Sequence, residues 1–218
     1  MQIKTTLTRD LDKKKDESEK KRKKAMTRTG NPIQIKDLRL PKNIHPEKII
    51  GNIDRNDSMH IWTLDKWTKI YSLSDQHRTG VRIRFDKNVD TEVKRSCKEF
   101  IAWLRKQYFF PQRVLIYIKA TEKIKAVDGD LVSATCLLPF DKKMEPYIRV
   151  STGTYYELKE RKGQDNALAT ILHSIAHELT HYYQWVNDIS LTEVGMERQA
   201  KAYAGFIIDE YSQTREHP

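Results

Sequence analysis

Apolar residues recur at helical spacing in two long stretches of the chain, and this pattern predicts two helices. The first follows Asp90, a residue that can cap a helix, and ends before Pro111. The second begins at a cap formed by Asp165 or Asn166 and continues without Pro or Gly to Trp185. Its apolar stripe consists of Leu168, Ile171, Leu172, Ile175, Leu179 and Tyr182.

Between these helices the pattern changes to short runs rich in β-branched and aromatic residues, which predict strands. A turn at Asp128-Gly129 precedes the second run, and a further strand at 81–85 comes before the first helix. This order predicts an α+β fold with a small mixed sheet of about three to four strands. The three runs cover 113–120, 131–138 and 147–151.

The second predicted helix carries the sequence His177-Glu178-Leu179-Thr180-His181, which is an HExxH pattern. Residues 177 and 181 share a face because a helix turns once every 3.6 residues. Neutral imidazole nitrogens bind zinc at roughly 2.0–2.1 Å, and zinc lowers the pKa of its bound water to about 7. Glu178, about 100° around the axis, can take the proton of that water. The motif therefore predicts amide hydrolysis at a zinc site, with two histidines on a solvated face as the alternative.

A catalytic zinc site needs a third protein ligand, and the residues after the motif offer Glu197. Ser190 and Glu193 have the spacing of a capping box, which predicts a third helix over roughly 191–212. Glu197 comes one turn later, in line with the apolar stripe of that helix. We expect its carboxylate to point inward, where coordination to a metal offsets the cost of burial. The alternative is an exposed pair with Lys201.

His173 extends the histidine spacing to 173, 177 and 181, but we do not expect it to bind the metal. Positions eight apart are separated by about 12 Å along a helix, too far for one ion to bridge all three. A hydrogen-bonding or surface position is the expectation for His173.

The chain resembles the zincin metallopeptidases of the gluzincin type, in which a second helix supplies a glutamate ligand. The resemblance rests on four residues, His177, Glu178, His181 and Glu197. The run 197–200, Glu-Arg-Gln-Ala, is similar to the E-x-x-A pattern of small cytoplasmic zincins of the ImmA/IrrE type. The resemblance covers roughly residues 91–212. It implies a zincin-like fold in which His177, His181 and Glu197 bind Zn²⁺ and Glu178 is the general base.

Two features of the chain qualify this resemblance. Lys201 stands where several such families place Asp or Asn, so support for the histidines must come from a backbone carbonyl or from elsewhere in the chain. The SprT-like proteases use a third histidine, and they are the weaker match because only His217 follows His181.

The resemblance also implies an edge strand near the metal that binds the substrate backbone by strand addition. The run 133–138 is the candidate, with Ser133, Ala134 and Thr135 as substrate-binding residues. An ordinary sheet strand is the alternative. Such sites often use a Tyr or His to stabilise the oxyanion, and Tyr203 is our first choice. The other candidates are Tyr182, Tyr183 and Tyr156.

Charge is uneven along the chain. Residues 1–30 hold eleven Lys/Arg and five Asp/Glu, so they contribute +6 of the overall net charge of +10. We expect this disordered or loosely helical arm either to bind nucleic acid or another polyanion, or to serve only as a solubilising tail. Residues 31–89 are interpreted as an N-terminal extension or small subdomain, and 90–218 as the zincin-like metallopeptidase domain.

The chain has two cysteines, Cys97 and Cys136, both in apolar surroundings, and it has neither a signal-peptide pattern nor 18 consecutive apolar residues. We therefore expect a cytoplasmic protein with no membrane segment. The predicted function is a zinc metallopeptidase, an endopeptidase rather than an exopeptidase, that acts on a protein or peptide substrate. Two alternatives stay open: an inactive zincin-like structural or binding module of a larger assembly, and a nucleic-acid-associated protease that uses the basic arm. The oligomeric state is not predicted.

Overall fold

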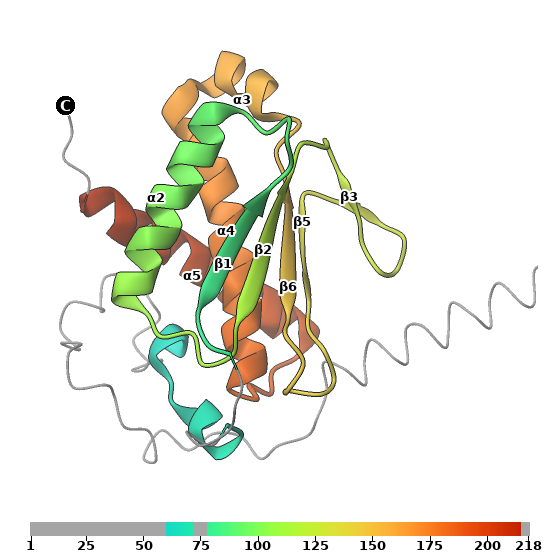
Figure 1. The fold of residues 1–218 in the computed structure, drawn as a ribbon, viewed down its shortest axis with the longest axis vertical. Coiled ribbons are helices and arrows are strands. Elements are labelled where there is room, and N and C mark those ends of the chain that lie inside the picture. The colour runs from blue at the N-terminus through green and yellow to red at the C-terminus, as the bar shows by residue number, and fades with distance from the viewer. Residues whose placement is uncertain (1–59, 72–77, 215–218) are drawn as a thin grey trace, which may run out of the picture.

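The computed structural model describes residues 60–71 and 78–214, which form an α+β fold (Figure 1). The basic arm predicted at 1–30 and the greater part of the predicted extension lie outside these residues. No helix in the described part of the chain is long and apolar enough to cross a membrane.

Four strands form the main sheet in the order β1-β2-β6-β5. The first three, β1 (Val81–Phe85), β2 (Val114–Lys119) and β6 (Tyr147–Ser151), are parallel. β5 (Ala134–Leu137) runs antiparallel to β6 and forms one edge. The prediction of a small mixed sheet is therefore confirmed.

The predicted run 131–138 is divided between two strands, because β4 (Leu131–Val132) pairs with β3 (Ile124–Lys125) in a separate two-stranded hairpin. The predicted turn lies in this hairpin, where Gly129 has a φ of +97°, a backbone conformation that favours glycine. Figure 1 shows the hairpin extending away from the helices.

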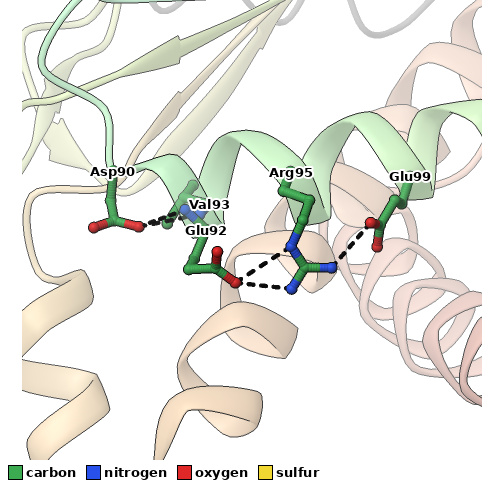
Figure 2. Close-up of polar contacts among 5 residues, drawn as sticks. All are labelled: Asp90, Glu92, Val93, Arg95 and Glu99. Carbon is green, nitrogen blue, oxygen red and sulfur yellow. Dashed lines mark hydrogen bonds and ion pairs between the residues drawn. The ribbon is translucent and has the colours of Figure 1, made fainter.

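α2 (Thr91–Gln107) begins where the sequence predicts. The Asp90 carboxylate accepts hydrogen bonds from the backbone N–H groups of Glu92 and Val93 (Figure 2). On the exposed face one turn further, Arg95 pairs with Glu92 at 2.8 Å and with Glu99 at 2.9 Å. These contacts support the first half of a helix whose other face is buried.

The starts of the next two long helices differ from the prediction. α4 (Gln164–Val186) begins after Gly163, whose φ is +82°, and neither Asp165 nor Asn166 is its cap. α5 (Glu193–Gln213) is capped by Thr192, whose Oγ1 accepts from the N–H of Gly195 at 3.1 Å, so the Ser190–Glu193 capping box was wrong. Thr192 fits the same capping chemistry two residues later.

A short helix, α3 (Tyr155–Lys162), was not predicted. Only Tyr155 of its eight residues is buried, so the sequence carries no apolar stripe that would reveal a helix. Figure 1 shows α3 directly before α4, at one end of the sheet.

The main sheet packs its apolar face against the helices in one hydrophobic core. Residues before position 90 belong to this core as well, through β1 and through the 3₁₀ turns η3 (Ile61–Thr63) and η4 (Lys66–Lys69) that precede it. The fully buried core includes Phe100, Ile101, Leu104, Val114, Ile116, Ile118, Ile148, Ile175 and Leu179.

Specific hydrogen bonds attach the segment 60–71 to α4 and α5. Trp62 Nε1 donates to Thr180 Oγ1 at 3.1 Å, within the HExxH sequence itself. The backbone N–H of Ile61 donates to the Tyr203 hydroxyl at 3.3 Å. Residues that precede the sheet thus contact both of the helices that carry the predicted ligands.

Candidate metal centre

Close packing of α4 against α5 places the predicted ligands on facing helices. Ala200 and Ala204 are completely buried, and small side chains at these positions allow the two helix backbones to approach. His177 and His181 come from α4, and Glu197 comes from the second turn of α5.

The ligand atoms of these three residues converge on one point. The Nε2 atoms of His177 and His181 are 3.3 Å apart. His177 Nε2 lies 3.4 Å from Oε2 of Glu197, and His181 Nε2 lies 3.4 Å from Oε1, the other oxygen of the same carboxylate. With one donor atom taken from each residue, the three atoms lie within 4.8 Å of one another. This grouping could hold one metal ion between the two helices.

Exposure differs among the ligands. The side chains of His181, His177 and Glu197 are 10%, 24% and 56% exposed. The Glu197 carboxylate therefore faces the histidines without being buried, in contrast to our expectation. Hydrogen bonds from His177 and His181 hold the pKa of Glu197 well below its usual range, so this carboxylate is ionised and ready to bind a cation.

Gln184 orients His181 from behind, and the sequence did not single it out. Its Oε1 lies 2.8 Å from Nδ1 of His181, which leaves Nε2 to face the metal position. Its Nε2 donates to the Met196 carbonyl at 2.9 Å and to Gln199 Oε1 at 3.0 Å, both on α5. One completely buried amide thus contacts His181 on α4 and hydrogen-bonds to the part of α5 that carries Glu197.

Glu178 lies beside the ligands in a buried position, with 7% of its surface exposed. Burial raises the pKa of this carboxyl, against the opposing effect of His181 and His177. The backbone N–H of Cys136, in β5, donates a hydrogen bond to it. Glu178 therefore lies between the ligand helix and the edge strand.

The pairing of β5 with β6 shows which backbone groups of the edge strand point outward. Ser133 O accepts from the Ser151 N–H at 2.8 Å, so Ser133 belongs to the hydrogen-bonded positions. Hydrogen-bonded and non-hydrogen-bonded positions alternate in an antiparallel pair, so the backbone of Thr135 also faces β6. Ala134 and Cys136 direct their backbone groups away from β6. Of the three predicted substrate-binding positions, only Ala134 therefore has outward backbone groups. Cys136, which was not predicted, has the same outward direction.

The four tyrosines considered for the oxyanion all have partners away from the ligands. Tyr203 is 2% exposed and its hydroxyl accepts from the Ile61 N–H, so this contact gives its predicted catalytic role no support. His173 is half-buried and lies outside the group of three ligands. The other tyrosine hydroxyls donate to the Gln112 carbonyl (Tyr182), the Phe109 carbonyl (Tyr183) and the Asp90 carboxylate (Tyr156).

Comparison of the chain with protein-family models, curated proteins and solved structures gives no match. The chemistry of the site is therefore inferred from its own residues.

Proposed function

We propose that this chain is a zinc-dependent metallopeptidase, similar to the gluzincin-type zincins, that hydrolyses peptide bonds within a protein or peptide. The observation that carries the proposal is the grouping of His177, His181 and Glu197, whose donor atoms, one from each residue, lie within 4.8 Å of one another. Two nitrogens and one oxygen are a donor set found in catalytic zinc sites. The chemistry that zinc supplies when bound is polarisation of a carbonyl oxygen and activation of water.

Glu178 is the proton carrier in this proposal. Its carboxylate takes a proton from the attacking water and gives it to the nitrogen of the leaving amine. A raised pKa favours this exchange, because an acid–base group works best when its pKa approaches the working pH. Burial against β5 also keeps the carboxylate away from bulk solvent.

The substrate lies along the outer edge of β5 in this proposal. The outward backbone N–H and carbonyl of Ala134 and the carbonyl of Cys136 would pair with an extended peptide, as in strand addition, while the Cys136 N–H stays bonded to Glu178. Because Cys136 also contacts Glu178, a peptide bound there would have its backbone next to the proton carrier. An extended substrate that runs past the site in both directions favours an endopeptidase.

A reducing compartment, the cytoplasm, is part of the proposal. Cys97 is a buried free thiol and Cys136 is a half-buried one. Burial raises the pKa of the Cys97 thiol to about 12, which keeps it protonated and unreactive.

The test compares zinc content and hydrolysis of a peptide library for the full chain, Glu178→Gln and Glu197→Ala. We expect Glu178→Gln to keep zinc and to lose about 10²–10⁴-fold in rate, since general base catalysis contributes about that factor. Glu197→Ala should lose zinc affinity. Glu193→Ala is the matched control, because it removes an exposed acid one turn earlier on the same helix.

Unchanged zinc affinity in Glu197→Ala would refute the ligand assignment. Zinc binding by the full chain without cleavage of any library peptide would instead identify an inactive zincin-like module.

A further inference from the structure

The main sheet has a second face that the helices leave open. Alternate side chains on the four strands point to opposite faces. One set packs into the core with the helices, and the other set contributes no residue to that core. Figure 1 shows the long helices gathered on one side of the strands. The open face is formed by Arg82, Arg84, Leu115, Tyr117, Lys119, Tyr147, Arg149, Thr135 and Leu137.

This open face carries more basic than acidic groups. Its four strands contain four basic residues and neither Asp nor Glu. Lys119 pairs with Asp86 at 2.8 Å. Arg82 and Arg84 are exposed and, within the described part of the chain, have no carboxylate partner. Arg149 donates to the Lys125 carbonyl at 3.0 Å, at the border with the β3–β4 hairpin, and likewise has no ion pair with a described acid.

Strand register aligns these arginines with tyrosines. Arg84, Tyr117 and Arg149 are direct neighbours across β1, β2 and β6. In the adjacent row, Arg82 is followed by Leu115 and then Tyr147. The two tyrosine rings meet edge to face with centroids 6.1 Å apart. In the first of these rows a tyrosine ring therefore lies between two guanidinium groups, with neighbouring strands about 4.8 Å apart.

We propose that this face binds single-stranded nucleic acid. Guanidinium groups bind phosphates, and tyrosine rings offer a surface on which unpaired bases stack. An unpaired strand can lie across the face of a four-stranded sheet with its bases turned toward the protein. The charge and the rings on this face complement the two parts of a nucleotide.

Two other occupants fit less well. Residues 1–30 of the same chain carry a net charge of +6, so the arginines would repel them. An acidic peptide would neutralise Arg82 and Arg84 but would make no use of Tyr117 and Tyr147. The proposal is independent of the peptidase chemistry, because the ligand-bearing helices lie on the other face of the sheet.

The test measures binding of a fluorescent oligothymidine of about 12 nucleotides to the full chain across a salt series. In Arg82→Glu/Arg84→Glu we expect at least about tenfold weaker binding and a salt slope reduced by about 1.4, because each phosphate contact contributes about 0.7. The control Lys106→Glu/Lys162→Glu changes the net charge equally, at exposed positions on α2 and α3. It should bind within about threefold of the unchanged chain.

A second variant separates stacking from charge. Tyr117→Leu should weaken binding by about fivefold or more while leaving the salt slope unchanged, because stacking is worth about 1–3 kcal/mol per base. Equal binding by the two charge-reversed proteins would overturn the proposal and assign any binding to the basic arm. Displacement by polyglutamate together with full binding by Tyr117→Leu would overturn it in favour of an acidic protein partner.

Discussion

Two buried histidines, His181 at the candidate metal centre and His60 behind it, show how opposite environments produce opposite properties. His181 is 8% exposed and His60 is 3% exposed. Burial lowers the pKa of His181, but hydrogen bonding to Glu197 and the charges of Glu178 and Glu197 outweigh it, so the net pKa is raised. Burial alone lowers the pKa of His60 to about 3.

The difference lies in the neighbouring groups. His181 has an amide on one ring nitrogen and a carboxylate facing the other. Both ring nitrogens of His60 are without hydrogen-bond partners in the described part of the chain. Its ring stacks on Tyr108 at 5.7 Å and meets the Tyr203 ring edge to face at 4.7 Å. One histidine therefore has a polar partner at each ring nitrogen, and the other is an aromatic core residue.

The largest effects, on zinc affinity and on the free energy of unfolding, should come from replacing each of these two histidines with alanine. His181→Ala should reduce zinc affinity by on the order of 10³-fold, because a zinc site distributes about 10–16 kcal/mol over a few ligands. His60→Ala should leave zinc affinity unchanged and lower the free energy of unfolding by about 3 kcal/mol, as for other large core side chains. Calorimetric zinc titration and urea unfolding of both variants measure the two quantities. Weaker zinc binding by His60→Ala would contradict the distinction drawn between the surroundings of His181 and His60.

A smaller effect is expected from Gln184→Leu, which removes the amide that contacts Nδ1 of His181. Loss of a group that orients a metal-binding histidine typically costs about 10–100-fold in metal affinity. Gln199→Ala is the control, because it removes one partner of Gln184 and leaves the contact with His181 in place. Competition with a zinc-sensitive dye measures both affinities. Equal affinities in the two variants would mean that Gln184 only joins the helices.

The shared face of His177 and His181 was predictable because their spacing depends on one helix alone. A turn of 3.6 residues aligns positions 177 and 181 whatever surrounds them. Glu197 was predictable only in part, because its place on the third helix follows from the sequence, whereas the burial expected from the apolar stripe was wrong and its side chain is 56% exposed. The cap at Asp90 and strands β1, β2 and β6 also depend on local composition and came out as predicted.

Other parts of the site depend on contacts between distant segments. Gln184 resembles any polar residue near a helix end until α5 supplies the Met196 carbonyl. The outward direction of Cys136 follows from the pairing of β5 with β6, which the sequence of the strand does not contain. The segment 60–71 joins the core through single side chains such as Trp62, without a periodic pattern. Such features appear only when the tertiary structure is known.

The smallest expected effect is a pH dependence of stability that His60 alone should cause. Its pKa is about 3 in the folded chain and 6.5 as the ordinary value, so the unfolded chain binds a proton in this window that the folded chain does not. The free energy of unfolding therefore falls as the pH drops below about 6.5, because the unfolded chain is stabilised by protonation of His60. The loss is about 2 kcal/mol at pH 5 relative to pH 7.

His60→Phe should remove this dependence, because phenylalanine fills the same aromatic surroundings and does not titrate. His181 and the acids around it titrate in both proteins, so the difference between the two unfolding free energies isolates His60. Urea unfolding between pH 7 and pH 5, in the presence of a chelator, should give a difference that shifts by about 2 kcal/mol in favour of the variant at the lower pH. A constant difference would mean that His60 finds a proton acceptor or solvent in the folded chain, and the contrast with His181 would then be one of degree.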